Sequence, residues 1–224
     1  WKKYREKYGE VMRLDRVLEK EDDSPNNYKA SKQADVLMLF YLFSSEEISK
    51  VFNHLGYKFK PQDIPANIEY YRKITSHGST LSQVIHSWVY ARSNRHSTWK
   101  SFKKALLSDI SDVQGGTTPE GIHLGAMAGT VDIIQRCYTG LDIRDNVLWL
   151  NPRLPKEIDE IKFHIKYRSH WINLRIDHKK ICIDFDKGWA GPVEINVQGK
   201  QKRFEKNESA EFELDVEKSK EFLG

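Results

Sequence analysis

The amino-acid sequence predicts an α+β protein, in which helices occupy roughly the first two-thirds of the chain and strands the rest. Up to about residue 147, apolar residues recur at helical spacing, and after it apolar and polar residues alternate. The 224 residues are 39% hydrophobic and 30% charged, which is ordinary for a globular protein and enough for one or two domains. We therefore expect a helical part at residues 1–147 and a β domain at residues 148–224.

Six segments carry helix signals: residues 35–43, 44–57, 64–75, 79–93, 98–110 and 121–138. The first, DVLMLFYLF, is apolar on every side and is predicted to be buried all round. The second begins with Ser44 and Glu47, which have the spacing of a capping box, and it has Gly56 near its end. The last is rich in small residues, and we expect it to pack closely against its neighbours.

Six further segments alternate apolar and polar residues with the period of a strand: residues 161–168, 170–177, 179–185, 192–198, 200–204 and 209–215. Short loops of Asp, Lys, Gly and Asn separate them, which is typical of an antiparallel sheet or sandwich. The proline-punctuated stretch LWLNPRLP, residues 148–155, marks the change from helices to strands. We expect His164, His170 and His178 at surface or edge positions of these strands rather than as metal ligands.

Several classes of function find no support in the sequence. The net charge of +4 is spread along the chain, without the dense Lys and Arg cluster of a nucleic-acid-binding protein. No apolar run is long enough to span a membrane. Zinc-binding spacings, a Walker loop and a dinucleotide fingerprint are also missing. We therefore expect no nucleic acid or membrane partner, no metal and no organic cofactor.

The cysteines and the start of the chain bear on its location. Cys137 and Cys182 lie far apart, which is typical of a protein from a reducing compartment or of one that is indifferent to redox conditions. No signal peptide is recognisable, and we expect a cytoplasmic protein. The chain starts at Trp1 without a methionine, so we also expect it to be a piece of something longer.

The first candidate site is the stretch DVQGGTTPEGIHLGAMAGT, residues 112–130. A loop that is rich in backbone and hydroxyl donors opens it: Gly115, Gly116, Thr117 and Thr118. Such a loop before a helix is a natural anion site. Glu120 and His123 lie three residues apart and are predicted to share one helical face beside it, which makes them catalytic candidates. The alternatives are a plain glycine-rich turn with a threonine cap, and a Glu120 that only favours the helix dipole.

The second candidate is SHGSTLS, residues 76–82, which repeats the order of histidine, glycine and hydroxyls before a helix: His77, Gly78, Ser79 and Thr80. Two such helix starts indicate a shared pocket for an oxygen-rich ligand, and phosphate fits because its anionic oxygens need several donors. The alternative is that Ser79 or Thr80 only caps the helix.

The third candidate is the pair Lys32 and Gln33, just before the apolar helix. Lysine only donates hydrogen bonds and glutamine both donates and accepts, which matches the vicinal hydroxyls of a sugar. The alternative is a pair of solvated surface residues.

Taken in order, SKQAD, SHGSTLS, DVQGGTTPEGIHLGAMAGTVDIIQRCYTG and LWLNPRLP, followed by the β-rich tail, resemble the C-terminal part of glycoside hydrolase family 65. The resemblance covers nearly the whole chain, and the family contains trehalose, maltose, kojibiose and nigerose phosphorylases together with some hydrolases. It implies that residues 1–147 are the later helices of an (α/α)6 barrel and that residues 148–224 are a small C-terminal β domain. Such a part of a barrel is expected to expose a wide apolar face, residues 35–43 included.

The resemblance also implies roles for the candidate residues. Lys32 and Gln33 would hold the glucosyl hydroxyls, and Glu120 and His123 would lie at the junction of glucosyl group and phosphate. Phosphate would be bound by two groups of residues: His77, Gly78, Ser79 and Thr80, and Gly115, Gly116, Thr117 and Thr118. The family's general-acid glutamate belongs to a motif that this chain lacks, so we expect the isolated chain to be inactive.

The reaction implied is the cleavage of an α-glucoside by inorganic phosphate, as co-substrate, with inversion to β-glucose 1-phosphate. The implied partners are the disaccharide, phosphate, the preceding part of the same barrel and a second copy of the chain. An inverting hydrolase of the acid-trehalase type is the alternative within the family, with Glu120 as the base that activates water. A non-catalytic carbohydrate-binding or structural module is the alternative from another class.

Overall fold

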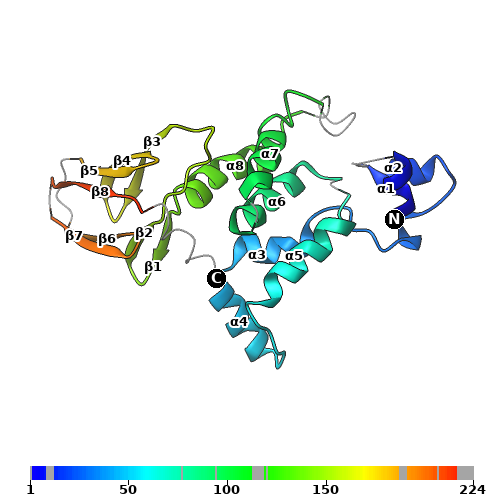
Figure 1. Ribbon diagram of the computed structural model, residues 1–224, viewed down its shortest axis with the longest axis horizontal. Helices are drawn as coiled ribbons and strands as arrows, with labels where there is room; N and C mark the ends of the chain where they lie inside the picture. The colour runs from blue at the N-terminus through cyan, green and yellow to red at the C-terminus, as the bar shows by residue number, and fades with distance from the viewer. Residues whose placement is uncertain are drawn as a thin grey trace. The chain divides into compact units, whose positions relative to one another are not determined.

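The computed structural model describes residues 2–8, 13–76, 78–93, 95–112, 119, 121–186, 191–205 and 207–215. The chain divides into two compact units, Trp1–Ile133 and Ile134–Leu223. The first is helical and the second is built from strands, which confirms the α+β class (Figure 1). The division falls before residue 147, because the first strand of the second unit already begins at Asp142.

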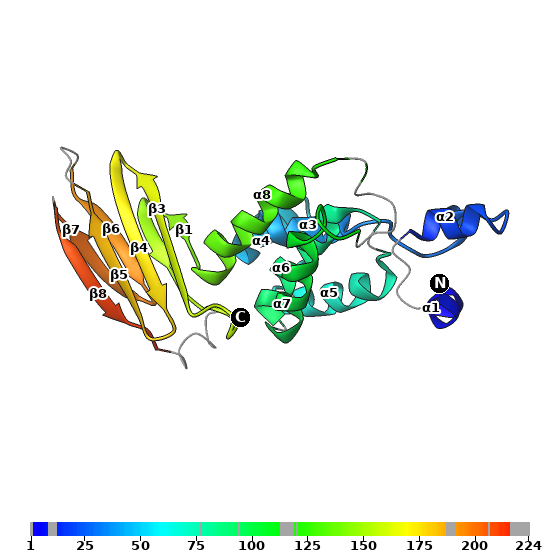
Figure 2. The ribbon, with the colours of Figure 1, turned by 90° about the horizontal axis from the view of Figure 1, so that it is seen from above.

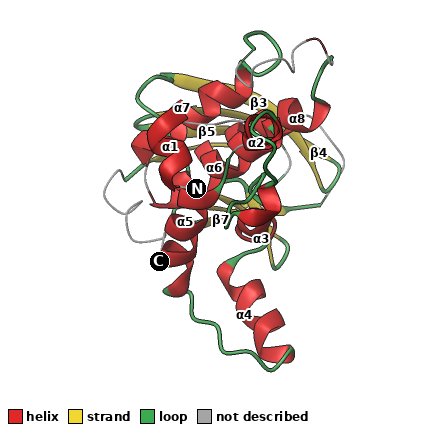
Figure 3. Cartoon of the chain, turned by 90° about the vertical axis from the view of Figure 1, so that its right-hand side faces the viewer, coloured by secondary structure: helices red, strands yellow, loops and turns green. Residues whose placement is uncertain are grey.

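The helices of the first unit, drawn in red in Figure 3, have the following bounds: α1 (Lys2–Tyr8), α2 (Leu14–Glu19), a 3-10 turn (Pro25–Asn27), α3 (Asp35–Leu42), α4 (Ser45–His54), α5 (Asp63–Ile74), α6 (Thr80–Ser93), α7 (Arg95–Leu106) and α8 (Leu124–Asp132). Each of the six helical segments expected from the sequence is present. The segment 121–138 differs from the expectation, because its helix begins only at Leu124 and continues after Asp132 as a π-helix, Ile133–Tyr138.

The start of α4 has the capping box that the sequence predicted. The Glu47 N–H donates to Ser44 Oγ at 3.2 Å, and the Ser44 N–H donates to Glu47 Oε2 at 2.8 Å. The two bonds satisfy main-chain donors that the first turn of a helix leaves without partners. Gly56 follows the helix with a φ of +79°, a backbone conformation that glycine adopts without strain.

Helix α6 is the centre of the helical unit and packs against α3, α5, α7 and α8. Val84, Ile85 and Val89 on it are fully buried. The Trp88 Nε1–H donates to the carbonyl of Phe40 in α3 at 3.2 Å, which ties the two helices together. The core of this unit therefore lies around α6.

The expectation that α3 is buried all round is wrong. Leu37 and Phe40 are buried, but Val36 and Leu42 are 41% and 56% exposed. Helix α3 packs mainly against α5 and α6, and its Tyr41 hydroxyl donates to Asp132 Oδ2 of α8 at 2.6 Å. An apolar face is thus exposed here, as expected from the resemblance.

The second unit contains two four-stranded sheets (Figure 2). One sheet has the order β1 (Asp142–Arg144), β2 (Val147–Leu150), β6 (Val193–Val197), β7 (Lys200–Phe204). The other has the order β3 (Glu160–Tyr167), β4 (His170–Asp177), β5 (Lys180–Phe185), β8 (Ser209–Glu213). The six strands expected from the sequence are all present, and β1 and β2 are additional.

The first sheet is mixed rather than purely antiparallel, since β2 and β6 run parallel with Leu148 opposite Ile195. The chain between these two strands builds β3, β4 and β5 of the other sheet, and such a long crossover allows a parallel pair. The expectation of a wholly antiparallel unit is therefore corrected for this one pair.

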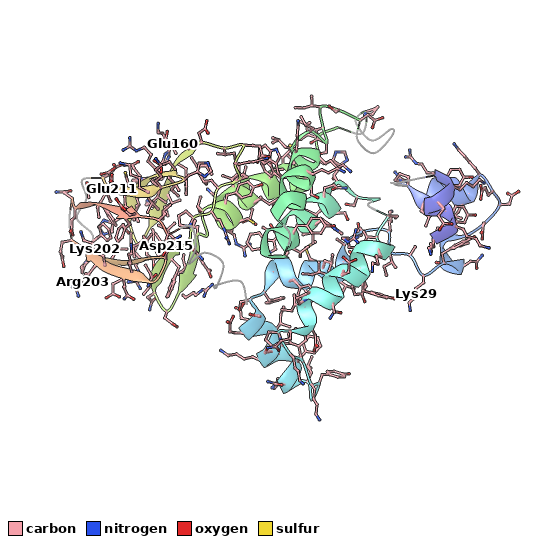
Figure 4. All side chains as sticks on the ribbon, viewed as in Figure 1. Lys29, Glu160, Lys202, Arg203, Glu211 and Asp215 are labelled. Atoms are coloured by element: carbon pink, nitrogen blue, oxygen red, sulfur yellow. The ribbon has the colours of Figure 1, made fainter. Side chains whose placement is uncertain are left out.

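One hydrophobic core lies between the two sheets. It combines buried residues of β2, β6 and β7 with buried residues of β4 and β5. The rings of Phe185 and Phe204, from different sheets, stack with their centroids 5.2 Å apart. The outer surface carries exposed ion pairs such as Lys180 with Glu211 at 2.9 Å, and Figure 4 labels Glu211 and Glu160 on this unit. The unit is a β-sandwich.

The three strand histidines differ in burial. His164 and His178 are exposed, as expected. His170 is 4% exposed, its Nε2 lies 2.6 Å from the carbonyl oxygen of Gly191, and its ring meets Phe185 edge-on. The surface or edge position predicted for His170 is therefore wrong, because the inward face of β4 carries it into the core.

Candidate functional site

The segment that carries Lys32 runs beside the loop that leads into α6. Ser31 pairs with Thr75 in a parallel bridge, and the Ser76 N–H donates to the carbonyl of Ser31 at 2.8 Å. The Gly78 N–H then donates to the carbonyl of Lys32 at 2.7 Å. Two of the three motifs selected from the sequence are thus held together by their main chains, although more than forty residues separate them.

The side chains of Lys32 and Gln33 differ in their contacts. Gln33 Nε2 donates to Asp35 Oδ1 at 2.8 Å, which uses one amide donor and orients the side chain against the first turn of α3. The Lys32 side chain is exposed. The pKa of Asp15 in α2 is lowered, first by the hydrogen bond from Arg13 and to a smaller extent by the positive charge of Lys32.

The preceding residues anchor this segment to α5. The ammonium of Lys29, labelled in Figure 4, lies 5.5 Å from the centroid of the Tyr70 ring. An ammonium group over the face of an aromatic ring is attracted by the ring's electron density. The contact adds to the main-chain bonds that fix Ser31 and Lys32.

The hydroxyls at the start of α6 are not used as helix caps within the described part of the chain. The Ser82 N–H donates to the carbonyl of Ser79 at 3.1 Å, which begins the helix. The side chains of Ser79 and Thr80 make no hydrogen bond to a described residue. Thr80 is 6% exposed, and Gly78 and Ser79 are partly exposed. The hydroxyl of the partly exposed Ser79 is therefore available to a ligand.

His123 lies at the N-terminal cap position of α8, where Asp109 holds it by two hydrogen bonds. The His123 N–H donates to Asp109 Oδ2 at 2.9 Å, and His123 Nδ1 lies 2.6 Å from Asp109 Oδ1. The side chains are 24% and 10% exposed, so the contact is mostly shielded from water. Burial raises the pKa of the Asp109 carboxyl, but the hydrogen bonds from His123 more than offset this and lower it.

An ionised carboxylate only accepts hydrogen bonds, so the proton of this contact is assigned to His123 Nδ1. Nε2 then points away from Asp109 with no hydrogen bond to any described residue. Asp109 was not among the candidate site residues predicted from the sequence. A signal was present, since a carboxylate beyond the C-terminal end of α7 opposes the helix dipole and needs another partner.

The predicted helical face shared by Glu120 and His123 is corrected in part. The helix starts only after His123, because Gly121 has a φ of +101° and Gly121–His123 are not helical. The other selected residues lie outside the described ranges: His77, Gly115, Gly116, Thr117, Thr118 and Glu120. Their predicted roles stay predictions. Among the described residues, no hydrogen bond joins His123 to the loop at Gly78–Thr80.

The β-sandwich has a cavity of its own, apart from the residues named above. A shallow cavity of about 300 Å³ lies in the β-sandwich and contains none of the selected residues; Arg168, Arg203, Asp145 and Glu194 are among its lining. Within the described ranges, no three His, Cys, Asp or Glu side chains are grouped so that they could hold a metal ion. No described helix has the length and apolar composition that crossing a membrane requires.

Sequence comparison identifies the class of protein. Residues 1–132 match the family model described as the glycosyl hydrolase family 65 central catalytic domain. Residues 141–204 match the model of the C-terminal domain of the same family. Both matches agree with the two units of the structure. The chain belongs to glycosyl hydrolase family 65.

This chain corresponds to only part of each relative that it matches. The chain is 50% identical over 203 residues to an uncharacterized glycosyl hydrolase of Mycobacterium tuberculosis, covering 91% of this chain and 15% of that protein. It is 34% identical over 181 residues to trehalose 6-phosphate phosphorylase of Lactococcus lactis, covering 80% and 24%. A solved structure assigned as a kojibiose phosphorylase from the human microbiome matches with a TM-score of 0.64 at 27% identity, covering 81% and 22%. The chain thus spans about a quarter or less of these relatives.

Proposed function

We propose that this chain carries the phosphate- and glucosyl-binding half of an inverting disaccharide phosphorylase. The observation that carries the proposal is the 2.7 Å hydrogen bond from the Gly78 N–H to the Lys32 carbonyl, because it unites the candidate sugar motif with the candidate phosphate motif. The names of the characterised relatives support it, since they include phosphorylases of trehalose 6-phosphate, maltose, trehalose and kojibiose.

The residues divide between two ligands. Lys32 and Gln33 hydrogen-bond the hydroxyls of the glucosyl group, Lys32 as a donor and Gln33 through its amide oxygen. Ser79 and Thr80 donate to the oxygens of phosphate, and Nε2 of His123 accepts a hydrogen bond from a phosphate hydroxyl. The hydroxyls suit this role because no described residue occupies them.

The reaction is a single displacement with inversion. A general acid protonates the glycosidic oxygen, and a phosphate oxygen attacks the anomeric carbon from the opposite face while the bond to the acceptor sugar breaks. The acid belongs to preceding helices of an (α/α)6 barrel that this unit completes. On the side of phosphate, Ser76–Ser82 contains no carboxylate, which suits an incoming anion that a carboxylate would repel.

The test uses the complete protein that contains this sequence. It is incubated with trehalose, trehalose 6-phosphate, maltose, kojibiose or nigerose, with and without inorganic phosphate, and products are followed by ¹H and ³¹P NMR. We expect β-glucose 1-phosphate that forms only with phosphate. Glucose released equally without phosphate would identify a hydrolase and direct attention to Glu120 as the base. Binding of these sugars without any product would identify a non-catalytic module.

A further inference from the structure

Asp109 makes more contacts with His123 than a helix cap requires. One carboxylate oxygen accepting one main-chain N–H is enough to cap α8, and Oδ2 does this at 2.9 Å. The second oxygen, Oδ1, lies 2.6 Å from the imidazole Nδ1. The same carboxylate therefore fixes both the main chain and the ring of His123.

The turn that carries Asp109 is itself firmly held. The Ser108 Oγ donates to the carbonyl of Ala105 at 2.8 Å, and the Ser111 N–H donates to the carbonyl of Leu107 at 2.8 Å. Ser108 is 1% exposed. A carboxylate on such a turn has little freedom, so the imidazole that it holds is also confined in position.

The outer side of His123 is open, in contrast to the side toward Asp109. The two neighbours in sequence, Ile122 and Leu124, are 72% and 75% exposed. With Nδ1 engaged, Nε2 is the ring atom that remains for a ligand. A neutral imidazole with Nδ1 protonated offers a lone pair at Nε2, and an imidazolium offers an N–H there.

We propose that Asp109 is the positioning residue for His123, whose ring it holds with Nδ1 protonated so that Nε2 faces the phosphate of the proposed reaction. The inference rests on the proposed function for the identity of the ligand, but the Asp109–His123 pair itself is independent of it. Asp109 acts through His123 and does not touch phosphate.

The decisive variant is Asp109→Asn in the complete protein. The amide oxygen keeps the cap on α8, while the amide NH₂ faces Nδ1 and favours the ring with its proton on Nε2. We expect KM for inorganic phosphate to rise about tenfold or more, the change expected for losing a charge-assisted hydrogen bond, with KM for the disaccharide unchanged. The variant should remain folded at neutral pH, with a midpoint of thermal unfolding that falls only because the charged contact with His123 is lost.

Two further variants separate positioning from folding and from general charge effects. His123→Gln places a side-chain amide, whose oxygen accepts a hydrogen bond as Nε2 does, near the position of Nε2 and has no Nδ1 for Asp109 to hold, so adding Asp109→Asn to it should leave KM for phosphate unchanged. Asp63→Asn removes an exposed carboxylate at the start of α5, outside the site, and should also leave it unchanged. An equal rise in KM in the His123→Gln background, or with Asp63→Asn, overturns the proposal.

A spectroscopic measurement tests the pair without catalysis. Long-range ¹H–¹⁵N spectra of the His123 ring should show Nδ1 protonated in the unsubstituted protein and unprotonated in Asp109→Asn. An unprotonated Nδ1 in the unsubstituted protein overturns the proposal whatever the activity. If the unsubstituted protein makes no phosphate-dependent product, the proposed function fails, while the ring spectra still decide the role of Asp109.

Discussion

Gly129 of α8 lies so close to Val84 of α6 that a Cβ atom at residue 129 would stand 2.5 Å from Val84 Cγ1. Both residues are fully or almost fully buried. The close approach explains why the segment that becomes α8 is rich in small residues, since a side chain at this position would separate the two helices.

Gly129→Ala should destabilise the protein, because the new methyl group has to displace the Val84 side chain in a packed core. Overpacking of this kind costs about 1–3 kcal/mol of the free energy of unfolding. Urea unfolding, monitored by circular dichroism, measures the change.

Gly125→Ala is the matched control on the same helix, since a Cβ there meets nothing within 4 Å. It should be neutral or should stabilise the protein by up to about 1 kcal/mol, because alanine favours the helix. Equal destabilisation by both variants would mean that contact with Val84 does not decide the effect.

Gly140 and Gly199 allow backbone strain to be separated from a steric clash. Both have positive φ, +64° and +85°. A Cβ at residue 140 would lie 2.5 Å from the carbonyl oxygen of Asn151, whereas one at residue 199 would meet nothing within 4 Å. Gly199→Ala should therefore lower the free energy of unfolding by about 1–2 kcal/mol, which is the cost of the left-handed conformation for alanine. Gly140→Ala should lower it by more, because a steric clash is added. A smaller loss of unfolding free energy for Gly140→Ala would contradict this account.

The sequence predicts those elements whose signals are local. The alternation of residues 170–177 is visible in the strand itself, and the capping box at Ser44 needs only four residues. β1 was missed because it has three residues, all exposed, and so no alternation of buried and exposed positions. The parallel pairing of Leu148 with Ile195 could not be predicted, because it joins strands that local patterns cannot align.

The same limit applies to the candidate site. The motifs at Lys32 and at Gly78 were each recognised, but only family resemblance related them, since nothing in either segment encodes their pairing. Asp109 was missed for the same reason, because its partner His123 lies across the loop that joins α7 to α8. The dipole argument marks Asp109 as unusual without naming its partner.

Ser79→Ala in the complete protein should weaken phosphate binding and leave sugar binding intact. The Ser79 hydroxyl has no hydrogen bond to a described residue, so removing it costs little stability, whereas a bond to an anion contributes about 1.5–3 kcal/mol. We expect KM for inorganic phosphate to rise about tenfold or more. Ser49→Ala is the control, because the Ser49 hydroxyl donates to the carbonyl of Ser45 within α4. An unchanged KM for phosphate in Ser79→Ala would remove this residue from the site.

The lowered pKa of Asp109 makes part of the stability depend on pH. The folded state holds the carboxyl ionised through the hydrogen bonds of His123, so its pKa is below that of the unfolded chain. The stabilisation is therefore present above the unfolded pKa and is lost as the pH falls through the folded one. Asp109→Asn removes this dependence, and the difference in unfolding free energy between the unsubstituted protein and the variant should shrink steadily in acid. Urea unfolding at a series of pH values measures it, and a difference that stays constant as the pH falls would show that the charge of Asp109 does not contribute.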